Sequence, residues 1–188
     1  GSLGLTDYST NRSFSIGNYG GNFDSSQDGW SGNVYLERGY TFGLGQMNLQ
    51  PYGGLQYTFI HQDSFDESGW QGLNLIGEDS DYDSLQSVLG IRLNRELALR
   101  GRLLDISVYT NWTHEFLETT ADGYAAFSGN PNVPFRVVGN GLGRDFAMLG
   151  GGGNWTINDR LQLFGSCDLQ LNSYVQTISG NAGAQYSW

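Results

Sequence analysis

The side chains best suited to acid–base chemistry are the two histidines, His61 and His114. His61 lies two residues before Asp63, but general acid–base catalysis also needs a nucleophile or a second acid within hydrogen-bond reach. The sequence shows no such constellation, and two separated histidines fall short of a metal site. We therefore expect no enzymatic activity, no bound metal and no cofactor.

A second candidate is the acidic run of residues 78–83, because clustered carboxylates are the ligands that Ca²⁺ prefers. The run lacks the spacing of an EF-hand, so we interpret it as a solvated loop. The single Cys167 cannot form an internal disulfide. The net charge of −10 and the complete lack of lysine exclude nucleic acid as a partner, since phosphates require a basic face.

The elements that must position these residues are strands, because apolar and polar residues alternate over long stretches. The alternating stretches are 49–59, 85–93, 104–116, 161–171 and 177–188. Two further strands are predicted at 30–44 and 142–157, and a weaker eighth at 12–22. Arg38 falls in an apolar register, which we interpret as a strand irregularity or a side chain that reaches a membrane interface.

Alternation alone also fits a soluble sandwich, so a second criterion is needed. No stretch reaches the about 18 apolar residues of a membrane-spanning helix, whereas a spanning strand needs only about 9–11. If the C-terminus is periplasmic, the inner connections should be short and the outer ones longer. The predicted inner connections are residues 45–47, 96–102 and 158–159, and the outer ones are 23–29, 62–83, 118–141 and 173–175. Only 173–175 is shorter than expected, and most acidic residues fall in the outer set.

Aromatic residues on the apolar face gather near the strand ends, as in the girdles of membrane barrels. The outer group is Tyr57, Phe59, Trp112 and Phe116, and the inner group is Tyr40, Phe42, Tyr186 and Trp188. A soluble sandwich has no reason to separate aromatic residues, charge and loop length along one axis. We therefore predict an all-β, antiparallel, up-and-down transmembrane β-barrel in the bacterial outer membrane, in contact with its lipid and lipopolysaccharide.

Five charged residues alternate onto the opposite, polar face and are predicted to face the lumen: Glu37, Arg92, Asp105, Glu115 and Asp168. An arginine that faced lipid at the midplane would cost about 2–4 kcal/mol, so inward placement is expected of any barrel. We interpret these residues as structural ion pairs or solvated lumen groups. They would also line a hydrated pore and keep a passing chain from adhering.

The C-terminal residues resemble the β-signal by which the barrel-assembly machinery recognises outer-membrane barrels. The pattern is carried by Asn181, Gly183, Tyr186 and the terminal aromatic Trp188. A final strand with free edge groups can pair with the edge strand of the assembly machine before closure. The resemblance implies this machinery as a partner.

Five segments in order resemble the translocator domain of autotransporters, the type V secretion proteins, over most of the chain. They are Leu-Gln-Pro-Tyr at 49–52, Ser-Leu to Leu-Gly-Ile-Arg-Leu at 84–93, Trp-Thr-His-Glu-Phe at 112–116, Ala-Phe-Ser-Gly-Asn-Pro at 126–131, and Phe135 to Asp145. The resemblance implies a twelve-stranded barrel, threaded by a helix, that exports or anchors a covalently linked upstream passenger.

About eight strands are expected here, so we interpret residues 1–188 as one barrel domain, the C-terminal portion of a larger barrel truncated at its N-terminus. Gly1 and Ser2 are treated as a candidate cloning remnant. Two alternatives stay open: a small complete outer-membrane barrel with a structural or binding role, and a soluble calcium-dependent lectin-like β-sandwich. Solubility without detergent, with stabilisation by calcium, would favour the latter.

Overall fold

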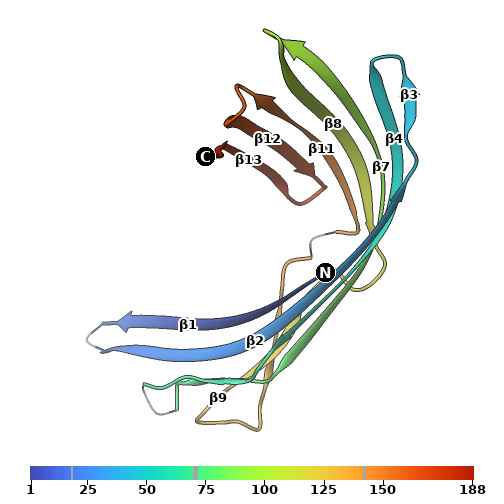
Figure 1. Ribbon diagram of the computed structural model, residues 1–188. Helices are drawn as coiled ribbons and strands as arrows, with labels where there is room; N and C mark the ends of the chain where they lie inside the picture. Colours follow the sequence, from blue (N-terminus) through green and yellow to red (C-terminus); the bar gives the residue numbers. More distant parts are fainter. Residues whose placement is uncertain (18, 70–71, 142) are drawn as a thin grey trace. The chain divides into compact units, whose positions relative to one another are not determined.

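A computed structural model describes residues 1–17, 19–69, 72–141 and 143–188, and the described parts consist of strands and turns (Figure 1). The main sheet is antiparallel, with the strand order β1-β2-β4-β7-β8-β11-β12-β13. Its strands are β1 (Ser2–Ile16), β2 (Tyr19–Gly39), β4 (Met47–Gln62), β7 (Ser80–Leu99), β8 (Arg102–Glu115), β11 (Asp145–Thr156), β12 (Leu161–Leu171) and β13 (Gln176–Tyr186). The short β3 (Phe42–Leu44) pairs with the start of β4.

Each strand of the main path is hydrogen-bonded to its successor, so the prediction of an antiparallel up-and-down sheet of about eight strands is confirmed. Within the described residues β1 and β13 are the end strands of this path. No helix in these residues is long and apolar enough to cross a membrane.

The two long connections between main strands build a second, four-stranded sheet. Its order is β10-β9-β6-β5, with β5 (Phe65–Asp66) and β6 (Leu75–Gly77) from the connection after β4. The other two strands, β9 (Asp122–Phe127) and β10 (Phe135–Val138), come from the connection after β8. We call this assembly the loop sheet. Its β5 end joins β2 through the bridge between Asp24 and Ser68.

The predicted inner connections are short, and two of the predicted outer connections, those after β4 and after β8, are long. Arg100 and Gly101 turn the chain between β7 and β8 with φ of 54° and 75°, the paired left-handed conformation of a tight hairpin. Asn158 closes the connection before β12 by accepting the backbone N–H groups of Arg160 and Leu161, both at 2.9 Å. Asn172 closes the short outer connection before β13 in the same way.

The sequence interpretation was wrong at the N-terminal end. Residues 12–22 are not one strand and 23–29 are not a loop, because β1 and β2 form one hairpin whose backbone register runs from Ser2↔Asn33 to Ile16↔Tyr19. Asp24 therefore lies inside β2, where its carboxylate accepts a hydrogen bond from Asn11 at 2.6 Å. The connection predicted at 96–102 is also shorter, since β7 continues to Leu99. Residue 142, the first of the predicted strand 142–157, lies outside the described residues.

The distribution of apolar residues is the reverse of that in a soluble domain. The buried apolar set is small and consists of Phe23, Tyr52, Val88, Ala125 and Ala126. Large apolar side chains on the strands are instead exposed, among them Leu36 at 70%, Leu89 at 56% and Ile178 at 75%. A monomer in water rarely exposes so many, whereas a barrel in lipid must.

Residue contacts divide the chain into two compact units. The first contains residues 1–34, 57–85 and 117–141, and the second contains 35–56, 86–116 and 142–188. The first unit therefore holds the β1–β2 hairpin and the loop sheet. The second holds the remaining lengths of the main strands.

Candidate functional site

The polar face of the main sheet in the second unit carries a connected set of side chains centred on Arg92 of β7. Its guanidinium donates to Gln50 at 2.9 Å and lies 3.5 Å from the Glu37 carboxylate. It also lies over the Tyr52 ring, with 4.7 Å to the centroid. Tyr35 donates to the other oxygen of Glu37 at 2.7 Å. Arg92 and Glu37, predicted from alternation alone, are thus brought together.

A second contact on this face joins Tyr109 of β8 to Asp168 of β12 across β11. The backbone register places Arg92 opposite Tyr109, Tyr109 opposite Gly150, and Gly150 opposite Asp168. The Tyr109 hydroxyl donates to the Asp168 carboxylate. A Cβ atom on Gly150 would collide with both the Tyr109 ring and the Asp168 carboxylate, so the glycine is required for their close approach. The contact accounts for at least the first glycine of the run at 150–153.

A third set lies nearer the outer end of the same strands. Glu115 is 2% exposed, and Gln86 donates to its carboxylate at 3.1 Å. Asn111 donates to the Tyr52 hydroxyl at 3.2 Å, and this hydroxyl passes over Gly90, where a Cβ would collide with it. Hydrogen bonds of this kind satisfy polar groups that the strands hold out of bulk water.

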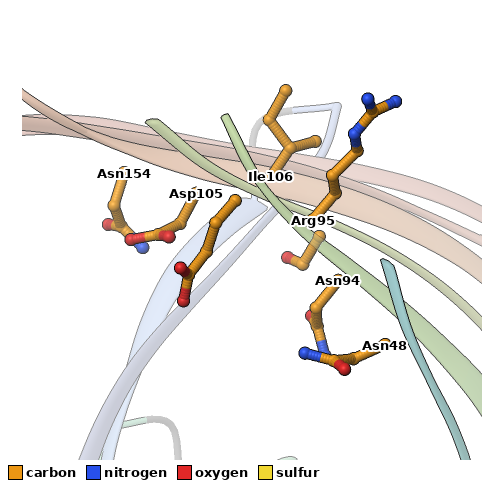
Figure 2. Close-up of a pocket in the computed structure, with 8 residues that line it drawn as sticks. Asn48, Asn94, Arg95, Asp105, Ile106 and Asn154 are labelled. Carbon is orange, nitrogen blue, oxygen red and sulfur yellow. The ribbon is translucent and has the colours of Figure 1, made fainter. Parts of the chain in front are cut away.

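Toward the inner ends of the strands the polar face becomes a row of amides with two acids, Asp105 and Glu96, which lie opposite each other in the register of β7 and β8. Figure 2 shows Asn48, Asn94, Asp105 and Asn154 on one side of the sheet, with Arg95 and Ile106 directed to the other. These residues line a pocket of about 290 Å³. Asp105 lies opposite Asn154 in the register of β8 and β11. The polar alternation thus continues along the strands.

The structure therefore places all five predicted lumen-facing charges on one face of the strands. It pairs Glu37 with Arg92 and joins Asp168 to Tyr109, whereas Asp105 lies opposite Glu96 of β7 and Asn154 of β11. The sequence interpretation did not include the tyrosines Tyr35, Tyr52 and Tyr109 among the candidate lumen residues, although alternation places Tyr109 on the polar face of its strand. A count of tyrosines at polar positions of the strands would have found them.

The two histidines lie at the outer ends of β4 and β8 and not in a catalytic arrangement. The ring nitrogens of His61 lie 2.6 Å from Asp81 and 3.1 Å from Asp63. The Asp81 hydrogen bond is the main cause that raises the pKa of His61. Both ring nitrogens are thus engaged by carboxylates, and neither is free to accept a proton from a nucleophile.

His114 forms a similar contact with the first residue of the next strand. Its Nδ1 lies 2.9 Å from Asp145, whose same oxygen accepts the indole N–H of Trp112 at 2.9 Å. The His114 hydrogen bond is the largest cause that lowers the pKa of Asp145. In the acidic run, Asp81 binds His61, and Asp83 accepts from Tyr57 at 2.6 Å. Among the described residues no group of three or more histidine, cysteine or acidic side chains could hold a metal.

The residues assigned to the aromatic girdles are exposed, except for the half-buried Phe59. Tyr40 and Phe42 are 68% and 47% exposed, and Trp112 and Phe116 are 44% and 51% exposed. Tyr57 and Phe59 pack together with 6.2 Å between ring centroids, and Trp30 lies 5.0 Å from Phe59. Trp30 is a neighbour that the sequence interpretation did not include. Arg38, next to the last residue of β2, lies close to Tyr40 in sequence, in keeping with an interface position.

The four residues of the C-terminal motif lie on and just beyond β13. Asn181 donates to Ser166 at 2.9 Å, and the ring of Phe164 occupies the space above Gly183. Tyr186 is paired with Leu161, and Trp188 is fully exposed. Within the described residues β13 pairs with β12.

The first unit contains one further ion pair of note, which the sequence did not predict. Arg12 of β1 donates to both carboxylate oxygens of Glu67, at 3.0 and 2.6 Å, and lies 4.1 Å from the centroid of the buried Phe23 ring. Glu67 also accepts the N–H of Leu75 at 2.8 Å. Hydrogen bonds from Arg12 are the main cause that lowers the pKa of Glu67. The pair fixes the connection after β4 to the β1–β2 hairpin.

Comparison with known proteins agrees with this arrangement. The family model of the autotransporter β-domain matches residues 1–168. Two extracellular serine proteases of Serratia marcescens are similar, one 28% identical over 176 residues and the other 26% identical over 169. In each case the match covers 88% of this chain and 16% of the relative, so the chain spans about one sixth of the curated relatives. The chain belongs to the autotransporter β-domain family and is an outer-membrane β-barrel translocator for a passenger domain.

Proposed function

We propose that this chain exports its passenger along the polar face described above. The observation that carries the proposal is the division of the strands into an exposed apolar face and a continuous polar face. The polar face presents tyrosine hydroxyls, amides and charged groups, of which Arg92, Glu37 and Asp168 are bound by neighbours within the sheet. A polypeptide that moves past such a surface finds weak, exchangeable hydrogen bonds and no large apolar area to hold it.

Within this proposal the charged side chains are fixed by their neighbours. Arg92 is held between Gln50, Glu37 and Tyr52, and Asp168 is held by Tyr109. Fixed charges keep the lumen hydrated, while their pairing limits strong binding of the passing chain. The five lumen-facing residues therefore act as structural and solvating groups.

The translocator itself is proposed to perform no catalysis. The names of the relatives describe proteases, but the matched region covers 16% of their length. We propose that this chain supplies the export step and not proteolysis, with the passenger covalently linked upstream. The occupied ring nitrogens of His61 support that view.

Assembly and membrane contact complete the proposal. The pattern of Asn181, Gly183, Tyr186 and Trp188 on and just beyond β13 supports recognition by the barrel-assembly machinery. The exposed aromatic residues and the apolar face support direct contact with outer-membrane lipid and lipopolysaccharide.

The test compares two single variants, one with a change on the polar face and one with a change at the adjacent position on the apolar face. Asp168→Leu removes the Tyr109 partner and adds an apolar group to the polar face, whereas Cys167→Leu changes the adjacent position on the apolar face. In the full-length protein, surface exposure of the passenger is followed by added protease. We expect Asp168→Leu to slow export several-fold and Cys167→Leu to leave it unchanged, with equal amounts of heat-modifiable barrel. Equal export by both variants would contradict the proposed role of the polar face.

A further inference from the structure

The first unit contains a cavity of about 340 Å³ between the loop sheet and the outer lengths of β2, β4 and β7. One wall is apolar and is formed by Phe65 of β5 and by Phe135 and Val137 of β10. A second, polar part of the lining, the amide wall, includes Gln27 of β2 and Gln62 of β4.

Strand alternation places four of the lining residues on one face of the loop sheet, while Asp122 and Tyr124 reach the cavity from the alternate positions of β9. Phe135 and Val137 lie opposite Ala125 and Gly123 in the register of β9 and β10, so these four residues share one face of the loop sheet. The small residues leave the space open, and a Cβ on Gly123 would meet no atom within 4 Å. Arg136 and Val138 alternate onto the other face. Val137 is 51% exposed although it lies on the cavity side.

The amide wall belongs to the same faces of β2 and β4 as the polar contact between Asn33 and Thr58, whose side chains are 2.7 Å apart. Gln27 shares the parity of Asn33, and Gln62 shares that of Thr58. The cavity therefore continues the polar face of these two strands and does not belong to the lipid-facing surface.

The hydrogen bonds of Gln27 and Gln62 leave one acceptor and one donor available in the cavity. Gln27 donates its amide N–H to the Asp63 carbonyl at 2.6 Å, which leaves its own side-chain oxygen as an acceptor. Gln62 accepts from Ser80 at 3.5 Å, which leaves its amide nitrogen as a donor. One acceptor and one donor on neighbouring strands match the N–H and C=O of a peptide backbone.

The charge of the lining residues restricts which kind of ligand can occupy the cavity. The cavity lining includes the acidic residue Glu78, and Asp122, whose carboxylate is paired with Arg136, and it includes no basic residue. An acidic segment would be repelled, whereas a neutral or basic segment with an apolar side chain would fit both walls. Lipid is a poor match, because the amide wall has no counterpart in an acyl chain.

We propose that this cavity is a cradle for an extended, non-acidic segment of the exported polypeptide, with its backbone at Gln27 and Gln62 and an apolar side chain against Phe135 and Val137. The inference rests on the proposed export function. The cradle holds the segment on the outer side of the strands after it has passed along the polar face. It therefore gives the loop sheet a role as a receptor for the passing chain.

The test uses two neighbouring valines on opposite faces of β10. A photo-crosslinking amino acid replaces either Val137 or Val138 in the full-length protein, and the cross-linked partner is identified by mass spectrometry. We expect Val137 to give roughly tenfold more adduct with the protein's own upstream chain than Val138, the ratio set by one well-made contact. Equal yields, or adducts of Val137 mainly with lipid or another protein, would overturn the cradle.

A second measurement separates this inference from the function on which it rests. The passenger exposed at the cell surface is measured in the same cells, with the Gln62→Met variant beside the unaltered protein. We expect Gln62→Met, which keeps the side-chain length and removes the donor, to lower the Val137 adduct several-fold. Normal export with an unchanged adduct would overturn the cradle alone, whereas no surface-exposed passenger from the unaltered protein would overturn the export function.

Discussion

The connection after β4 and the connection after β8 both begin beside a histidine and end at an aspartate on the next strand. His61 meets Asp81 across the base of the first connection, and His114 meets Asp145 across the base of the second. Each histidine follows an aromatic residue by two positions, Phe59 in one strand and Trp112 in the other. The same local arrangement therefore closes both long loops where the strands leave the aromatic girdle.

The His61–Asp81 contact closes the first long loop and the His114–Asp145 contact closes the second, and we call these contacts the loop bases. They differ in the number of carboxylates around the histidine ring. His61 has a carboxylate at each ring nitrogen, an arrangement that requires both nitrogens to donate and so favours the imidazolium. His114 has one carboxylate partner, Asp145, at Nδ1. The contact at the first loop therefore depends on protonation of His61, whereas at the second loop His114 and the Trp112 indole share the Asp145 carboxylate.

The loops also differ in the ion pair that holds each one. Arg12 binds Glu67, which is 6% exposed, whereas Arg136 binds Asp122 with exposed fractions of 55% and 25%. Burial determines how much such an ion pair contributes to stability. An exposed ion pair contributes little, whereas a buried carboxylate that loses its partner destabilises the fold. The comparison predicts that the first connection depends on its ion pair and that the second does not.

Loss of the Arg12 pair should have the largest effect. Arg12→Leu leaves the buried Glu67 without its cation, and we expect a local loss of about 1–2 kcal/mol, below the value for a fully buried pair because Arg12 is 38% exposed. The readout is hydrogen exchange of the Ser68 N–H, which bonds to the Asp24 carbonyl at 2.8 Å. Asn11→Ala removes an exposed hydrogen bond on the same strand and should leave this exchange unchanged. Equal exchange in both variants would contradict the comparison.

The two loop bases should respond to pH in opposite directions. Since the pKa of His61 is raised above 6.5, its contribution is complete below that value and is lost as pH rises through the folded-state pKa. Since the pKa of Asp145 is lowered below 3.8, its contribution is present above that value and is lost as pH falls through the folded-state pKa. Proteolysis of residues 63–79 should therefore increase above neutral pH, while that of residues 116–144 should not. A parallel increase in both would contradict the distinction.

A smaller effect is expected when the two carboxylates beside His61, those of Asp81 and Asp63, are removed one at a time. Asp81 is the nearer partner of His61 and the largest cause of its raised pKa, whereas Asp63 contributes less. We expect Asp81→Asn to lower the pKa of His61 clearly and Asp63→Asn to lower it less, as measured by NMR titration of the imidazole. A larger effect of Asp63→Asn would show that the more distant contact dominates.

The main strands could be predicted from sequence because lipid on one side and water on the other impose a period of two. That constraint ends above the membrane, so it gave no guidance at residues 19–29, where glycine, serine, asparagine and glutamine continue β2. The Arg12–Glu67 pair was unpredictable for the same reason, since 55 residues separate its members and only the folded loop sets their distance.

Part of the polar face could also be predicted from the sequence. Alternation placed Glu37 and Arg92 inward, but their pairing depends on the relative register of β2, β4 and β7, which local patterns do not determine. The role of Gly150 emerged only with the Tyr109 ring lying over it. At the loop bases, Asp81 was treated as one of several solvated acids in the run 78–83, so its contact with His61 was not predicted.

The smallest effect is expected at the ion pair of the second connection. Arg136→Leu removes a guanidinium from the exposed side of β10, where solvent already screens its attraction to Asp122. Backbone pairing of β9 and β10, from Phe135↔Ala125 to Val138↔Asp122, does not involve the side chain. Hydrogen exchange at Gly139, whose N–H bonds to the Ala121 carbonyl at 2.8 Å, should therefore match that of the unaltered protein. Faster exchange at Gly139, similar to that caused by Arg12→Leu at Ser68, would mean that burial does not distinguish the two ion pairs.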